Sequence, residues 1–289
     1  MLNRQRVLVH LLQQAGRPVS KIDLMKWCFL LRNETPSHGG SAFYDFLPYH
    51  YGPFSFCLYR EIDSLLGDGV VKASDGRSWQ VFGKQDDATD GLSNAVRQDI
   101  ARILRRFEEK PTSWLVNYVY EQYPWFTVNS RKRQLAARPV APLAVYTAGY
   151  EGQQVDGFLN LLMRTGIQRL LDVRHNPVSR RYGFHKTTLA RLCKSLEIEY
   201  IHCPELGILP VLRQTLKTPA DYEFLFTTYE AELFADKAVA VGEVSKLVQA
   251  KPSVLVCMEA NPQMCHRSRL ATAICGKTHL PIRHLEESE

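Results

Sequence analysis

Apolar residues in the first part of the chain recur at the spacing of amphipathic helices, between turns rich in glycine and proline. The pattern predicts helices over residues 4–14, 20–31 and 55–66. Two short apolar runs, at 70–71 and 79–82, follow on either side of a polar glycine turn, as in a hairpin. Helices followed by a short hairpin are typical of a winged helix. The sequence therefore predicts a mostly helical, winged-helix-like first domain.

The pattern changes after about residue 142, where apolar runs alternate with helical segments. Strands are predicted at 143–147, 169–173, 199–202, 238–241 and 254–258, and helices at 155–165, 187–196, 222–235 and 267–275. Strands that alternate with helices favour a Rossmann-like α/β domain with a largely parallel sheet. A linker near 134–142 would separate a domain over 1–140 from this second domain over 143–289.

Composition and charge narrow the class of protein. No apolar run is long enough to span a bilayer, so we expect a cytoplasmic protein with no membrane partner. The seven cysteines contain no CxxC pair, which argues against a disulfide framework and a zinc knuckle. The net charge is +6, and residues 1–140 carry most of it, with 19 Lys and Arg against 14 Asp and Glu. The run Arg131-Lys132-Arg133 is therefore a candidate nucleic-acid contact.

Polar residues follow the predicted strands of the second domain. The carboxyl ends of parallel strands meet at one edge of a sheet, where ligands of such folds bind. The sequence thus predicts one site built from several loops. Its candidate anion-binding residues are Tyr150, Glu151, Arg174, Ser179, Arg180, His202 and Arg267, and its candidate catalytic residues are Asp172, Glu259, Cys265 and His266.

The segment 259–268 contains several side chains close together in sequence that could bind a ligand or take part in catalysis. Cys265, His266 and Arg267 are consecutive where a helix is predicted to begin. Backbone N–H groups at a helix start favour anions and lower the pKa of a thiol. Glu259 could act as a general base or hold Arg267 in a bidentate pair. We interpret the segment as an anion site rather than as the site of a nucleophilic cysteine.

Purely structural interpretations stay open for several of these residues. Asp172 and Arg174 could form a salt bridge at a strand end, His202 could be a core histidine, and Cys257 could simply pack. Four side chains supply metal-ligand types: Cys257, Cys265, His266 and His284. Their spacing matches no common zinc pattern, so we expect no metal and no cofactor.

Two families resemble parts of the chain. The motifs YTAGYEG (146–152), LLDVRHNPVSRRYGF (170–184), YIHCPELG (200–207) and VLVCMEANPQMCHRS (254–268) resemble the domain-of-unknown-function 488 family in order. That resemblance implies an α/β fold with a polar site, without an assigned activity. The motifs HYGPFSFCLYREIDSLLGDGVV (50–71) and YVYEQYPWFTVNS (118–130) are similar to the YwgA-like winged-helix family, which implies a nucleic-acid or regulatory role.

The LLDVR element (170–174) is also similar to a rhodanese strand. A rhodanese, however, places its cysteine directly after the strand and an arginine a few residues later, whereas Cys257 precedes Arg267 by ten positions and Cys265 by two.

We expect a nucleic-acid-directed protein that acts on a nucleotide, base or phosphodiester, with the first domain docking on DNA or RNA and DNA as the favoured partner. A role in genome or phage defence, a small anionic or nucleotide ligand and a homodimer would fit this expectation. One alternative is a ligand-sensing DNA-binding regulator. Another is a sulfurtransferase or thiol phosphatase that uses Cys265.

Overall fold

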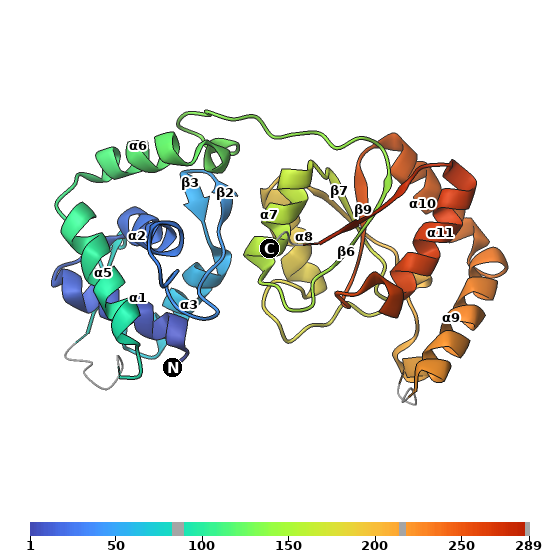
Figure 1. The fold of residues 1–289 in the computed structure, drawn as a ribbon, viewed down its shortest axis with the longest axis horizontal. Helices are drawn as coiled ribbons and strands as arrows, with labels where there is room; N and C mark the ends of the chain where they lie inside the picture. The colour runs from blue at the N-terminus through green and yellow to red at the C-terminus, as the bar shows by residue number, and fades with distance from the viewer. Residues whose placement is uncertain (83–89, 214–217, 287–289) are drawn as a thin grey trace. The chain divides into compact units, whose positions relative to one another are not determined.

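The computed structural model describes residues 1–82, 90–213 and 218–286. The chain divides into two compact units, Met1–Ala137 and Arg138–Glu289 (Figure 1). The division falls inside the segment 134–142, where the pattern of apolar residues along the sequence changes. Among the described residues, no helix is both long enough and apolar enough to cross a membrane.

Helices dominate the described part of the N-terminal unit. They are α1 (Asn3–Ala15), α2 (Lys21–Glu34), α3 (Phe56–Gly67), α5 (Asn94–Phe107) and α6 (Thr112–Gln122), followed by the short 3₁₀ helix η1 (Pro124–Thr127). The predicted helices over 4–14, 20–31 and 55–66 are thereby confirmed. Helix α2 lies in the middle of the unit, against α5 and α6, and apolar residues from Leu24 to Leu31 bury nearly all their surface there.

Serine caps explain where three of these helices begin. The hydroxyl of Ser20 accepts a hydrogen bond from the Asp23 N–H at 3.0 Å, and Ser55 accepts one from Leu58 at 3.2 Å. Ser93 caps α5 in the same way. Each cap satisfies a backbone donor that has no partner within the helix.

Short strands complete the N-terminal unit. β1 (Val19–Ser20), β4 (Val71–Ser74) and β5 (Ser78–Val81) form an antiparallel sheet of order β1-β5-β4. The predicted hairpin after α3 is therefore present as β4 and β5. A second hairpin, β2 (Leu47–Tyr49) and β3 (Gly52–Phe54), lies in the aromatic-rich stretch before α3.

A parallel sheet forms the centre of the C-terminal unit. Its strands are β6 (Val145–Gly149), β7 (Arg169–Asp172), β8 (Glu199–His202), β9 (Ser253–Cys257) and β10 (Ile282–Leu285), in the order β10-β6-β9-β7-β8. All four neighbouring pairs are parallel. The inner strands β6, β7 and β9 are buried along their whole length, which explains the short apolar runs within them. The predicted α/β domain with a parallel sheet is confirmed.

Helices cover both faces of this sheet (Figure 1). α7 (Val155–Thr165) and α8 (Lys186–Ser195) lie on one side, and α9 (Pro219–Phe234), α10 (Ala238–Ala250) and α11 (His266–Thr278) lie on the other. In the described part of this unit, three 3₁₀ helices lie in the connecting segments: η2 (Pro204–Leu206), η3 (Pro210–Arg213) and η4 (Pro262–Met264).

One element prediction for this unit was wrong, and one strand was not predicted. The run 238–241, predicted as a strand, is the first turn of α10, which buries Val241, Val244 and Val248 on one face. Four apolar residues alone do not separate a strand from a buried helix. Strand β10 was not predicted, because Arg283 and His284 are exposed at the edge of the sheet and leave no apolar run.

Candidate functional site

The loops that follow β6 and β9 are joined at the carboxyl edge of the sheet. Gly149 ends β6, and a Cβ atom added there would lie 1.8 Å from the carbonyl oxygen of Glu259, so only glycine fits. The backbone N–H of Glu151 donates to the Met258 carbonyl at 2.8 Å, and its carboxylate accepts from the Ala260 N–H at 3.1 Å. Two loops more than a hundred residues apart in sequence are thus held together by hydrogen bonds.

A buried ion pair lies at the end of β7. The Asp172 side chain is fully buried, and Arg174 donates to its two oxygens from Nε at 2.8 Å and from Nη2 at 2.6 Å. The Tyr200 hydroxyl donates to the same carboxylate at 2.7 Å. Burial and the Asp172 carboxylate raise the pKa of Tyr200, which stays a neutral donor.

The remaining donors of Arg174 also point into the protein. Nη1 donates to the Tyr150 hydroxyl at 2.8 Å and to the Phe184 carbonyl at 2.9 Å. The Tyr150 ring stacks on Phe184, with ring centroids 4.0 Å apart. The geometry is that of the strand-end salt bridge, and it leaves most of this guanidinium unavailable to a phosphate.

His202 supports the backbone at the end of β7. Its Nε2 lies 2.9 Å from the Arg174 carbonyl, and its Nδ1 lies 2.8 Å from the Lys186 ammonium group. Lys186 can only donate, so Nδ1 accepts and the Nε2 proton donates to the carbonyl. His202 therefore connects β8, the start of α8 and the backbone after β7.

A cluster of thiol, imidazole and carboxylate groups lies where β9 ends and α11 begins. The sulfurs of Cys257 and Cys265 lie 3.1 and 3.0 Å from Oε2 of Glu259, to which they donate. His266 Nδ1 lies 3.8 and 3.9 Å from the same two sulfurs, and its Nε2 lies 3.1 Å from the Val173 carbonyl. Only Glu259 is partly exposed. Burial raises the pKa of Cys265 well above its usual range, which disfavours a reactive thiolate.

Arg267 holds the loop of Glu259 through its backbone. Its side chain is 1% exposed, and it donates to the carbonyls of Glu259 and Ala260, the latter at 2.7 Å. The predicted bidentate pair of Arg267 with the Glu259 carboxylate is replaced by these contacts. Side chains in the first turn of a helix point back past its N-terminus, which directs the guanidinium onto the preceding loop.

A group of exposed cations near the site lies on a different segment, which runs from the end of β7 to the start of α8. Ser179 accepts a hydrogen bond from the backbone of Arg181, Arg180 is exposed, and the exposed Arg181 donates to the Gln153 carbonyl at 2.8 Å. Lys186 follows and is also exposed. Sequence reasoning did not select Arg181 or Lys186, although residues 173–196 contain no Asp or Glu, a signal that could have identified them.

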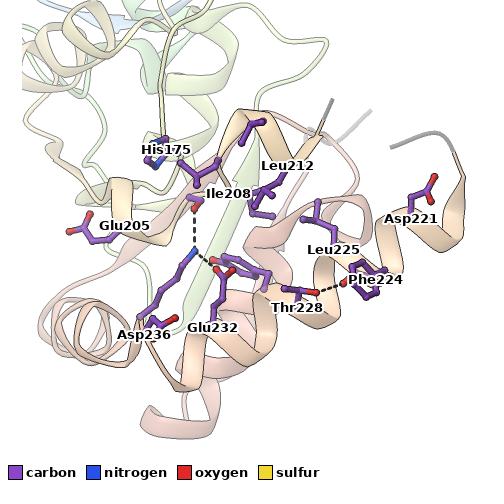
Figure 2. Close-up of a pocket in the computed structure, with 15 residues that line it drawn as sticks. His175, Glu205, Ile208, Leu212, Asp221, Phe224, Leu225, Thr228, Glu232 and Asp236 are labelled. Atoms are coloured by element: carbon purple, nitrogen blue, oxygen red, sulfur yellow. Dashed lines mark hydrogen bonds and ion pairs between the residues drawn. The ribbon is translucent and has the colours of Figure 1, made fainter. Parts of the chain in front are cut away.

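A pocket of about 770 Å³ lies beyond the ends of β7 and β8, between His175 and α9 (Figure 2). Apolar residues such as Phe224 and Leu225 form part of its wall. Its ionisable lining is mostly acidic: Glu205, Asp221, Glu232 and Asp236. Lys237 lies 2.9 Å from the Glu232 carboxylate, so this pocket is poorly suited to an anion. None of the predicted catalytic residues lines it.

The predicted site residues of the C-terminal unit therefore lie at one edge of the sheet, but in separate environments. His266 connects the Asp172–Arg174 pair to the thiol cluster through the Val173 carbonyl. Most of these side chains are buried and not exposed to solvent.

The candidate nucleic-acid contacts of the N-terminal unit lie on its surface. Arg131, Lys132 and Arg133 are exposed, and Arg133 lies 3.7 Å from Glu121.

Comparison with known families finds a match to part of the C-terminal unit. Residues 154–274 match the family model "Domain of unknown function DUF488". The DUF488 match includes β7, β8, β9 and the thiol cluster, and it bears out the resemblance of the C-terminal half. It does not reach the N-terminal unit, whose resemblance to YwgA-like proteins stays a prediction. No curated protein and no solved structure matches the chain.

Proposed function

We propose that this protein acts on nucleic acid, with a winged-helix-like N-terminal unit that docks on DNA and a C-terminal unit that binds the phosphate backbone beside its site. The observation that carries the proposal is the cationic segment 175–186, which contains Arg180, Arg181 and Lys186 and no acidic residue, next to the carboxyl edge of the sheet. Exposed Lys and Arg contacts to phosphate supply most of the non-specific affinity for nucleic acid.

The N-terminal unit supports the same function. Its helices α1, α2 and α3 and its sheet of order β1-β5-β4 support the winged-helix part of the proposal. Lys72 and Arg77, on the β4–β5 hairpin, are exposed, as are residues 131–133. We expect these cations to contact phosphates and not base edges.

Glu259 is the acid–base group that we favour for a reaction on the nucleic acid, because its side chain is partly exposed while Asp172 is fully buried. A nucleophilic role of Cys265 is less well supported, since the thiol has no exposed surface. Binding to a specific DNA sequence without turnover of a substrate would instead favour the alternative of a ligand-sensing DNA-binding regulator.

Binding can be measured by fluorescence anisotropy of labelled duplex DNA at several salt concentrations. We expect affinity to fall steeply with salt, and the double variant Arg180→Glu, Arg181→Glu to reduce the slope of log K against log salt by about two. Lys246→Glu, an exposed charge reversal on α10, is the matched control. The proposal fails if binding is absent at low salt, or if the double variant behaves like this control.

A further inference from the structure

The cluster at the start of α11 has the composition and geometry of a metal site. We infer that Cys257, Cys265, His266 and Glu259 bind a zinc ion. This inference does not depend on nucleic-acid binding, and with zinc bound Glu259 is a metal ligand in place of the acid–base group proposed above. It rests on four groups that the fold brings together from the end of β9, the loop after it and the first turn of α11.

The ligand atoms are close enough to share one ion. The sulfurs of Cys257 and Cys265 and a ring nitrogen of His266 all lie within 4.8 Å of one another. Zn–S bonds of about 2.3 Å and Zn–N bonds of about 2.0–2.1 Å in a tetrahedron imply a sulfur–nitrogen separation of roughly 3.6 Å. The distances from His266 Nδ1 to the two sulfurs, 3.8 and 3.9 Å, exceed this by only a few tenths of an ångström.

The imidazole of His266 has the orientation of a metal ligand. Its Nε2 lies 3.1 Å from the Val173 carbonyl, an acceptor, so this nitrogen carries the proton. The lone pair of the neutral ring is then on Nδ1, which faces the two sulfurs. Metal-bound histidines commonly donate their other ring N–H to a carbonyl or carboxylate in this way, which fixes the ring and its tautomer.

Glu259 supplies the fourth group. Its Oε2 accepts from both thiols at 3.1 and 3.0 Å, and an ion between these atoms would require the carboxylate to move outward by about half an ångström. The side chain is partly exposed and can make that movement. When zinc binds, the two thiols lose their protons to solvent, and each sulfur forms a bond to the metal as a thiolate.

The surroundings favour this ion. Two thiolates and one carboxylate exceed the charge of Zn²⁺, and the buried guanidinium of Arg267, hydrogen-bonded to the Glu259 carbonyl, adds compensating positive charge. Thiolate and imidazole ligands together select zinc over magnesium or calcium. The expectation of no metal came from sequence spacing, which does not reveal that the loop 258–264 returns Cys265 to Cys257.

The test uses the full-length protein, stripped of metal and kept reduced with a non-chelating phosphine. Titration with Zn²⁺ against a chromophoric chelator should give one ion per chain. Co²⁺ in its place should produce a thiolate-to-cobalt charge-transfer band and the visible bands of a tetrahedral site. Zinc should also protect Cys257 and Cys265, but not Cys275, from alkylation in the partly unfolded protein, as read by peptide mass spectrometry.

Variants identify the ligands. Cys257→Ser, Cys265→Ser and His266→Gln should each weaken zinc binding by more than about 100-fold, and Glu259→Gln by roughly 10-fold or more. Cys275→Ser changes a half-buried cysteine on the same helix outside the cluster and should bind zinc normally. If a cluster variant does not fold, the cobalt spectrum and the alkylation pattern of the unaltered protein still decide. The inference is overturned if the folded, reduced protein binds no zinc stoichiometrically or if its cobalt complex lacks the thiolate band.

Discussion

At the scale of single residues, the strongest constraint in the C-terminal unit is the Asp172–Arg174 pair. Arg174→Met would leave the Asp172 carboxylate buried without its cation, which should lower the free energy of unfolding by about 3–5 kcal/mol. Tyr200→Phe removes one hydrogen bond to the same carboxylate and should cost only about 1–2 kcal/mol. Urea denaturation followed by circular dichroism measures both. A cost for Arg174→Met no larger than that for Tyr200→Phe would contradict this account of the pair.

Lys26 is the buried cation of the N-terminal unit. Its ammonium group donates to the carbonyls of Tyr51 at 2.6 Å and Pro53 at 3.0 Å. Burial, and secondly the charge of Lys132, lowers the pKa of Lys26 from 10.5 to about 7. The unfolded chain therefore binds one proton more than the folded chain between about pH 7 and 10.5. Because this pKa is depressed in the folded state, the contribution of Lys26 to stability rises with pH through that window.

The pH dependence can be isolated with Lys26→Met. We expect the unfolding free energy of the wild type, relative to this variant, to increase between pH 7 and 10 by up to about 1.4 kcal/mol per pH unit. Lys21→Met, which changes a more exposed lysine on the same helix, serves as the control and should leave the slope unchanged. Parallel stability curves for the wild type and Lys26→Met would show that Lys26 stays charged when buried.

At the scale of elements, the contact of β6 with the loop after β9 is the tightest close approach at the site. Gly149→Ala would place a Cβ atom against the Glu259 carbonyl, so the loop must move. We expect a loss of stability of about 1–3 kcal/mol and, because Glu259 is displaced, weaker zinc binding. Gly242→Ala is the matched control, since a Cβ there meets no atom within 4 Å and lies inside α10. It should be neutral or stabilising. Gly149→Ala with normal stability and zinc affinity would show that the loop adapts freely.

The strands of the sheet and the residues at its carboxyl edge could be predicted from the sequence only in part. Short apolar runs identified β6, β7 and β9, because these inner strands are buried. Placing polar residues after each strand also led to Asp172, Glu259 and His266 at the carboxyl edge. The Asp172–Arg174 pair was one of the alternatives. The partners of Glu259 and His266 could not be predicted, because they depend on the directions of side chains and on the path of the loop after β9. Arg267 turns back onto carbonyls, and the loop after β9 brings Cys265 beside Cys257.

At the scale of the whole molecule, the two units have separate cores and their spectroscopic probes are separate too. All four tryptophans, Trp27, Trp79, Trp114 and Trp125, belong to the unit Met1–Ala137, so tryptophan fluorescence follows that unit alone. Circular dichroism follows the helices of both units. We therefore expect denaturation to give one fluorescence transition and a second transition seen only by circular dichroism.

Zinc should act on only one of these transitions. A ligand that binds the folded C-terminal unit at a hundred times its Kd stabilises that unit by about 2.7 kcal/mol, so the transition without a fluorescence change should move to higher denaturant. The fluorescence transition should stay in place with zinc and should shift with Lys26→Met, whereas Arg174→Met should affect only the other transition. If zinc moved the fluorescence transition by as much as the circular-dichroism transition, the two units would unfold as one cooperative body. The division at Ala137 would then describe compactness and not independent stability.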